Sequence, residues 1–166
     1  MPKLAINPVP CTGCLNCQVV CAQARAGDQD RRASAIAVEL DVFTGCHGHT
    51  VCRQCEVPGC ADACPRGAIG FDGETGAWII DREVCVRCGS CVGACPWGAM
   101  GWWDDEHGPV KCDLCGGSPR CVRACHFSVI KFLEPEDPEF SSNGMPEGEQ
   151  DPGLGRGTEP GKSLRS

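Results

Sequence analysis

Bulky apolar residues are scarce in this chain. Aromatic residues make up 5% of its 166 residues, tyrosine is absent, and Leu, Ile, Val and Phe together number 31. That share lies just under the roughly 20% below which a chain commonly fails to bury a core of its own. A conventional apolar core over the whole length is therefore nearly excluded, and something else must hold the fold together.

Long hydrophobic runs and basic runs are also missing. No window of about 18 apolar residues occurs, which excludes a transmembrane helix, and the first residues lack the apolar core of a secretory leader. The net charge is −7, and no run of Lys or Arg supplies the basic surface that nucleic-acid binding needs. We therefore expect a cytoplasmic protein with no nucleic-acid partner and no insertion into a membrane.

Cysteine, in contrast, is abundant, with 17 residues. In a reducing compartment structural disulfides are rare, so closely spaced cysteines indicate metal or redox sites. Sixteen of them form four groups, and Cys46 is left over. The groups are Cys11, Cys14, Cys17 and Cys21; Cys52, Cys55, Cys60 and Cys64; Cys85, Cys88, Cys91 and Cys95; and Cys112, Cys115, Cys121 and Cys125.

The spacing within the groups indicates iron–sulfur clusters. The first and third groups read C-x2-C-x2-C-x3-C, and the other two have a longer second spacing, x4 in the second group and x5 in the fourth. This run is typical of bacterial ferredoxins, in which the fourth cysteine ligates the other cluster of a pair. Zinc would use the paired C-x2-C hooks but would leave the spacing of the third and fourth cysteines unexplained. We therefore expect four [4Fe–4S] clusters on all sixteen grouped cysteines.

An internal repeat extends beyond the cysteines and predicts an α+β fold. Residues 64–71 (CPRGAIGF) and 95–102 (CPWGAMGW) align, and residues 125–132 are a degenerate copy. Each copy predicts a short helix, a turn with positive φ at Gly67 or Gly98, and a short strand. The expected helix in the first group lies within residues 15–24. Strands are expected at 4–6, 35–43, 69–71, 78–80, 100–103, 109–111 and 129–133.

Three further features have two interpretations each. Cys46, His47 and His49 could be a ligand set, but a loop ahead of the second group is favoured because the four groups are complete. His126 could hydrogen-bond the Cys125 sulfur, or simply occupy a turn. The four tryptophans could line an electron path, but packing around the clusters is favoured in a chain so short of apolar bulk. They are Trp78, Trp97, Trp102 and Trp103.

Residues 134–166 differ in composition from the rest and form an acidic tail rich in Pro and Gly. They carry eight acidic and three basic residues, and such a segment cannot bury a core of its own. We expect a docking arm on a partner subunit, with Phe140, Met145 and Leu154 as its apolar anchors. Deleting residues 141–166 should preserve the clusters but weaken complex formation. A truncated chain that assembles and transfers electrons at the full-length rate would contradict this.

The four groups, in this order, resemble the four-cluster ferredoxin-type subunits of multi-subunit oxidoreductases. The second and third groups with their prolines, and the segment Lys111-Cys112-Asp113-Leu114-Cys115, carry the resemblance, which covers about residues 4–133. That family serves molybdenum and tungsten pterin enzymes, hydrogenases and carbon monoxide dehydrogenases. The chain looks most like the small subunit accompanying tungsten aldehyde oxidoreductases. Ala22 and His126 depart from the family's proline, which affects the expected local backbone but not the ligands.

The resemblance implies that the two outer groups pair with each other, that the two inner groups do so too, and that each pair exchanges its fourth cysteines. The implied ligand sets are Cys11/Cys14/Cys17/Cys125, Cys112/Cys115/Cys121/Cys21, Cys52/Cys55/Cys60/Cys95 and Cys85/Cys88/Cys91/Cys64. It further implies one domain over residues 1–133 with two pseudo-symmetric ferredoxin-like lobes. The outer lobe comprises about residues 1–45 and 105–133, and the inner lobe about residues 46–104.

These features favour an electron-transfer subunit without catalytic activity. The grouped cysteines would saturate their irons, and no phosphate-binding loop, nucleotide fingerprint or Ser/His/Asp set occurs. The expected partners in an obligate complex are a tungsten or molybdenum pterin subunit and, as a further redox partner, a flavin- or NAD-binding subunit. Alternatives are a subunit of a hydrogenase, formate dehydrogenase or carbon monoxide dehydrogenase, a zinc-stabilised adaptor without redox role, and a free diffusible ferredoxin.

Overall fold

A computed structural model describes residues 1–27 and 29–137. The predicted docking arm therefore lies almost wholly outside the described residues. The elements are β1 (Lys3–Ile6), α1 (Asn16–Ala26), the 3₁₀ turn η1 (Arg31–Ala33), β2 (Ile36–Glu39), β3 (Gly48–Val51), α2 (Gly59–Asp62), β4 (Ile69–Asp72), β5 (Ala77–Ile80), α3 (Ser90–Gly93), β6 (Gly101–Trp102), β7 (Pro109–Val110), α4 (Arg120–Ala124) and β8 (Ile130–Leu133). In the part of the chain that is described, no helix is long and apolar enough to cross a membrane.

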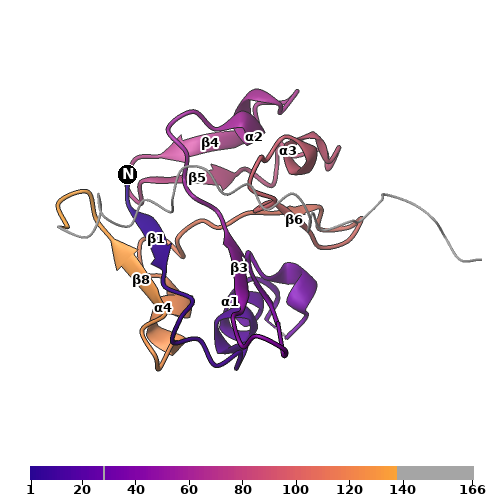
Figure 1. The fold of residues 1–166 in the computed structure, drawn as a ribbon. Coiled ribbons are helices and arrows are strands. Elements are labelled where there is room, and N and C mark those ends of the chain that lie inside the picture. The colour runs from indigo at the N-terminus through magenta and orange to yellow at the C-terminus, as the bar shows by residue number, and fades with distance from the viewer. Residues whose placement is uncertain (28, 138–166) are drawn as a thin grey trace, which may run out of the picture.

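The strands form four separate antiparallel pairs. Three pairs are hairpins, β2–β3, β4–β5 and β6–β7. The fourth joins β1 to β8, from Lys3 opposite Leu133 to Ile6 opposite Ile130, and so brings the two ends of the described chain together (Figure 1). Isolated two-stranded ribbons are marginally stable in water, so these pairs depend on what packs against them.

The helices also pack in pairs. Helix α1 contacts α4, and α2 contacts α3. In Figure 1 the first pair lies with β1, β8 and β3 in the lower part, and the second lies with β4 and β5 in the upper part. Each half of the molecule therefore contains one helix pair and one or more strand pairs.

The predicted helix–turn–strand repeat is present three times, as α2–β4, α3–β6 and α4–β8. Gly67 and Gly98 have the expected positive φ, at 61° and 57°, and Ser128 takes the same conformation in the third copy, at 52°. The first cysteine group departs from this pattern. There Ala22 keeps the backbone N–H that a proline lacks, and α1 continues to Ala26.

The strand expected over residues 35–43 is too long. Strand β2 ends at Glu39, and the chain turns back into β3, where His49 lies opposite Val38. The turn is closed by the Asp41 carboxylate, which accepts hydrogen bonds from the Phe43 and Thr44 N–H groups at 2.9 and 3.1 Å. The alternation of apolar and polar residues contains no information about such a local side-chain hydrogen bond, so it predicts a strand that runs past the turn. Because the chain turns back there, His49 lies in strand β3 and not in the loop that the sequence favoured.

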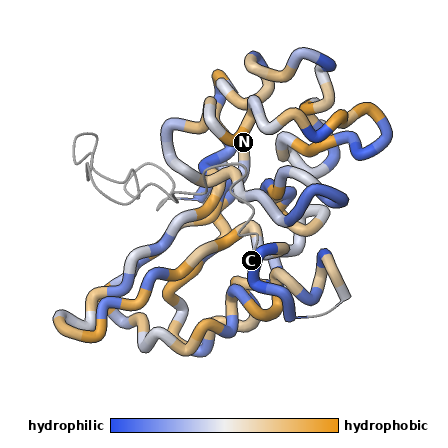
Figure 2. The backbone as a smooth tube through the Cα atoms, turned by 90° about the vertical axis from the view of Figure 1, so that its right-hand side faces the viewer, coloured by the Kyte–Doolittle hydropathy of each residue, from blue (hydrophilic) through white to orange (hydrophobic). Residues whose placement is uncertain are grey.

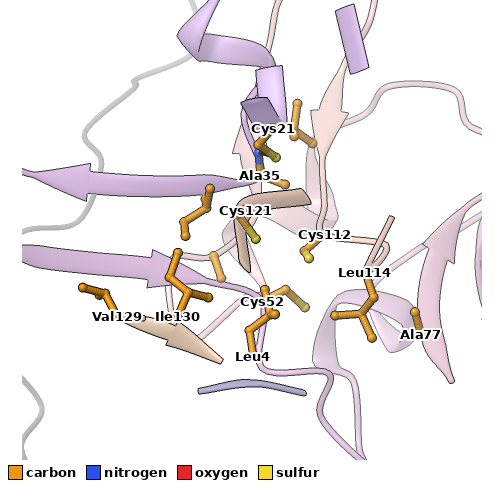
Figure 3. Packing of buried hydrophobic residues seen from close by; sticks show 13 residues of the cluster. Leu4, Cys21, Ala35, Cys52, Ala77, Cys112, Leu114, Cys121, Val129 and Ile130 are labelled. Atoms are coloured by element: carbon orange, nitrogen blue, oxygen red, sulfur yellow. Dashed lines mark hydrogen bonds between the residues drawn. The ribbon is translucent and has the colours of Figure 1, made fainter. Parts of the chain in front are cut away.

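The core is built from small aliphatic residues and cysteines. Its larger cluster comprises Leu4, Cys21, Ala35, Ile36, Cys52, Ala77, Ala99, Val110, Cys112, Leu114, Cys121, Val129 and Ile130 (Figure 3). A smaller one comprises Ile69, Cys91 and Met100. Hydrophobic and hydrophilic stretches alternate along the coloured part of the tube in Figure 2. Cysteines thus occupy the positions that bulky apolar residues hold in ordinary cores.

Candidate metal centres

The four C-x2-C hooks share one backbone conformation. The residue before the second cysteine has positive φ in each hook, at 68° for Gly13, 50° for Gln54, 56° for Arg87 and 54° for Leu114. This conformation costs a non-glycine residue roughly 1–2 kcal/mol. Three side chains that disfavour it nevertheless adopt it at the same position, which indicates that the hook geometry itself serves the site.

The two inner cysteine groups line two cavities. One cavity, of about 380 Å³ including open solvent, is lined by Cys52, Cys55, Cys60 and Cys95, here called the Cys55 quartet. The other, of about 330 Å³, is lined by Cys64, Cys85, Cys88 and Cys91, the Cys88 quartet. Each cavity combines three cysteines of one group with the fourth cysteine of the other, as in the inner ligand sets that the resemblance implies.

The first group is joined by the last cysteine of the fourth. Burial, with a smaller contribution from its neighbours Cys14, Cys125 and Cys11, raises the pKa of Cys17 to about 11. These four residues are called the Cys14 quartet. Since Cys11 and Cys125 are 114 positions apart in the chain, the pairing of α1 with α4 and of β1 with β8 is what brings them together.

The rest of the fourth group gathers around Cys21. Burial, with a smaller contribution from the neighbours Cys21 and Cys115, raises the pKa of Cys121 to about 12. Burial also raises the pKa of Cys112, which lies near Cys121 and Cys21. These four residues are the Cys115 quartet, and Figure 3 shows three of their side chains in the core.

Thiols of different quartets are also neighbours. The pairs are Cys17 with Cys121, Cys112 with Cys52, and Cys91 with Cys60. These contacts place the quartets in one linear order, Cys14, Cys115, Cys55, Cys88. Of the grouped cysteines, only Cys14 and Cys88 are exposed, and they belong to the two end quartets. Four of the five buried ones, Cys21, Cys52, Cys112 and Cys121, belong to the middle quartets.

The arrangement fits a multi-iron cluster better than a single ion. Zinc takes four ligands at about 2.3 Å from one centre, and among residues 1–27 and 29–137 no three His, Cys, Asp or Glu side chains converge on one such point. The thiols of the two inner quartets instead surround hollows, which suits a cluster that offers one iron to each thiolate.

Backbone N–H groups donate hydrogen bonds to the fourth cysteine of three groups. Ala68 donates to Cys64 Sγ at 3.2 Å, and Val129 donates to Cys125 Sγ at 3.3 Å, both from the turn that follows. The long helix α1 has no such turn, and Cys21 Sγ receives its bond from Ala35, also at 3.3 Å. Such bonds stabilise a thiolate and tune the reduction potential of an attached cluster.

The raised pKa values predict that cluster assembly depends on pH. Each thiol loses a proton when it binds iron, and the pKa values of about 11 at Cys17 and about 12 at Cys121 exceed the ordinary value near 8.5. When the metal-free chain is reconstituted with fixed amounts of iron and sulfide, we expect the iron bound per chain to rise between about pH 7 and pH 9.

The stability of the metal-free fold has the opposite pH dependence. A raised thiol pKa stabilises the folded state below the ordinary thiol pKa, and that contribution is lost as the pH rises through 11–12. More iron at higher pH would therefore not reflect a more stable metal-free chain. Iron analysis after reconstitution between about pH 7 and pH 9 measures the expected rise in bound iron, and a flat profile would contradict it.

Several residues at the site are invisible in the cysteine pattern. Arg25 on α1 forms an ion pair with Asp113 at 2.9 Å and donates to the Lys111 carbonyl at 2.6 Å, which ties α1 to the fourth hook. Lys111 Nζ lies 3.1 Å from Cys52 Sγ, and both side chains are buried. Only the motif around Cys112 marked Lys111 in the sequence, and nothing marked Arg25.

The tryptophans near the hooks make packing and hydrogen-bond contacts. The Trp78 Nε1–H donates to the Cys55 carbonyl at 3.0 Å, and the Arg53 guanidinium lies 3.6 Å from the centre of the Trp97 ring. Trp103 stacks on His107 with ring centres 3.7 Å apart. These contacts accord with the favoured packing role.

Cysteine-lined hollows on a frame of short hairpins and single-turn helices define a ferredoxin-type iron–sulfur protein. Residues 47–134, more than half of the chain, match the family model of the 4Fe-4S dicluster domain, and the chain belongs to this family.

Curated relatives agree with this assignment. The chain is 39% identical to the polyferredoxin-like subunit of aliphatic sulfonate oxidoreductase from Pyrococcus furiosus, over 74% of this chain and 70% of that protein. It is 34% identical to the electron transport protein HydN of Escherichia coli K12, over 69% of this chain and 78% of that one. The expected resemblance to ferredoxin-type subunits of oxidoreductases is thereby confirmed.

Two other matches are less complete. The beta subunit of NADH-dependent phenylglyoxylate dehydrogenase from Aromatoleum evansii is 36% identical over 78% of this chain, but the match spans only 30% of that protein. Among solved structures, the active site complex BamBC of benzoyl coenzyme A reductase aligns with a TM-score of 0.48 and 19% identity, over 80% of this chain and 79% of that one.

Proposed function

We propose that the chain is a non-catalytic electron-transfer subunit of an oxidoreductase complex, with one [4Fe–4S] cluster on each of the four cysteine quartets. The observation that carries this proposal is the grouping of thiols from distant segments, three from one group and the fourth from its partner group. Relatives named as electron-transport proteins or oxidoreductase subunits support it. Each cluster, when bound, supplies a one-electron redox centre.

The linear order of the quartets suits conduction from one end of the molecule to the other. The buried cysteines of the middle quartets keep that part of the line away from solvent, whereas Cys14 and Cys88 are exposed at the ends. We expect electrons to enter and leave near these two residues. The turn between β2 and β3, whose Leu40 and His47 lie next to Gly13 in the first hook, presents Val42 and Phe43. These are 78% and 98% exposed and offer an apolar contact to a partner.

The pairing of α1 with α4 and of α2 with α3 supports the two proposed lobes. The outer lobe would contain α1, α4, β1 and β8, and the inner lobe α2, α3, β4 and β5. Their proposed boundaries, at about residues 45/46 and 104/105, fall inside the turns of the hairpins β2–β3 and β6–β7. Each of these hairpins would then have one strand in each lobe and would hold the lobes together.

The proposed partner at one end is a catalytic subunit with a tungsten or molybdenum pterin, and at the other a flavin- or NAD-binding subunit. A relative named as a subunit of an oxidoreductase supports a catalytic partner, and a relative named as a subunit of an NADH-dependent dehydrogenase supports a partner that handles NAD. The alternative is a complex with a hydrogenase, formate dehydrogenase or carbon monoxide dehydrogenase. HydN, a relative named as an electron transport protein, supports a separate electron carrier as a second alternative.

Co-purification in the native host tests the partnership. The chain, tagged at its chromosomal locus and isolated without oxygen, should bring down a larger redox subunit in fixed ratio, with tungsten or molybdenum in the metal analysis. Elution of the tagged chain alone, with its iron intact, would contradict the complex and favour a free ferredoxin.

A further inference from the structure

Lys111 places a buried ammonium at the junction of the two middle quartets. The residue is 4% exposed, and its Nζ donates to Cys52 Sγ at 3.1 Å. It also donates to Gln54 Oε1 at 3.2 Å and to the Cys112 carbonyl at 3.3 Å. A single side chain thus contacts a thiol of the Cys55 quartet and the backbone of the Cys115 quartet.

Buried charges require a compensating charge. Two of the three acceptors around Lys111 are neutral oxygens, an amide and a carbonyl. The salt bridges among the described residues involve Arg25, Arg32 and His107 as cations, and Lys111 is in none of them. The group that can balance Lys111 is therefore the sulfur of Cys52, once it is a thiolate bound to iron.

Gln54 holds the ammonium in this position. It is 4% exposed and sits in the second hook with φ 50°. Its Nε2 donates to the Cys112 carbonyl at 2.9 Å, and its Oε1 also accepts a hydrogen bond from the backbone N–H of Trp78 at 3.0 Å. Lys111 and Gln54 thus share the Cys112 carbonyl as an acceptor, and such a satisfied buried network keeps its members in one geometry.

We propose that Lys111 is the charge partner of the cluster on the Cys55 quartet and raises the reduction potential of that cluster selectively. Reduction adds one electron and one negative charge there, while no bond forms or breaks and Lys111 keeps its proton. An ammonium hydrogen-bonded to the ligand sulfur stabilises the more negative, reduced form more than the oxidised form. The inference rests on the proposed function, because it requires a cluster on this quartet.

Redox titration of single variants tests this. In Lys111→Met, followed by electron paramagnetic resonance, we expect the reduced-to-oxidised ratio of one cluster to fall about tenfold or more at a given potential. For a one-electron couple this is a downward shift of about 59 mV. The other clusters should keep their potentials. Lys131→Met, which removes an exposed lysine on β8, is the matched control and should shift none.

Two further measurements separate electrostatic tuning from a structural role. Lys111→Gln retains a hydrogen-bond donor but no charge, and it should lower the same potential with all iron retained. In the unmutated protein, lysine labelled with ¹⁵N at Nζ should give a nitrogen coupling in the reduced-cluster signal, since Nζ is hydrogen-bonded to a ligand sulfur.

These measurements also decide the case in which Lys111→Met fails to hold its iron. Unchanged potentials in a fully loaded Lys111→Gln chain, or a labelled chain without the coupling, would overturn the role of Lys111. An unmutated chain that binds no iron–sulfur cluster would instead overturn the proposed function, so the two failures are distinguishable.

Discussion

Replacing Cys21 with serine is expected to damage the cluster whose other ligands belong to the fourth cysteine group. Cys21 lies beside Cys121 and Cys112, although it follows Cys17 by one helical turn on α1. Its sulfur is buried and receives the Ala35 N–H, so no neighbouring water can readily replace it. The variant should lose iron from one cluster, visible as a three-iron form or as complete loss of that signal.

The matched variant is Cys17→Ser, on the same helix. It should damage the other outer cluster, because Cys17 gathers with Cys14, Cys11 and Cys125. Variants on the fourth group identify which signal is which. Cys115→Ser should remove the same electron paramagnetic resonance signal as Cys21→Ser, and Cys125→Ser the same signal as Cys17→Ser. The reverse correspondence would refute the exchange of fourth cysteines.

A methyl group at Gly13 is expected to abolish the cluster on the Cys14 quartet. A Cβ at this position would lie 2.7 Å from His47 Nε2 and 2.8 Å from Leu40 Cδ2, and the backbone has φ +68°. The side chains of His47 and Leu40, which pack against the first hook, or the hook itself would have to shift. We expect Gly13→Ala to lose about a quarter of the iron, that of one cluster in four, while the other signals remain.

Gly27→Ala is the control for this substitution. Gly27 caps α1 with φ +73°, and a Cβ at this position would have no atom within 4 Å. Both variants therefore carry the cost of an alanine at positive φ, about 1–2 kcal/mol, but only Gly13→Ala meets a clash. Equal iron in the two variants, measured on chains purified without oxygen, would show that the crowding at the first hook does not matter.

Most of the local fold could be predicted from the cysteine spacing and from the proline that follows the fourth cysteine of a group. The three copies of the helix–turn–strand unit occur where the repeat predicts them, with positive φ at Gly67 and Gly98. The longer helix of the first group could also be predicted in principle, because Ala22 stands where proline ends the helix elsewhere. These features are local, and each depends on a few adjacent residues.

Contacts between distant segments could not be predicted from spacing. The pairing of β1 with β8 and the meeting of Cys52 with Cys112 depend on how the halves pack. The spacing indicates that fourth cysteines are exchanged within a pair of clusters, but only the family resemblance implied which groups form the pairs. The burial of Lys111 could not be predicted from the sequence, because lysine side chains are ordinarily exposed. Its position follows from the three acceptors that surround it in the folded chain.

The central claim, four clusters on sixteen cysteines, is tested most directly by chemical analysis of the intact chain. Protein prepared without oxygen should contain about sixteen irons and about sixteen acid-labile sulfides per chain, four of each per cluster. Its brown colour should bleach with dithionite. A fully folded preparation with about eight of each, or with zinc in place of iron, would contradict the account.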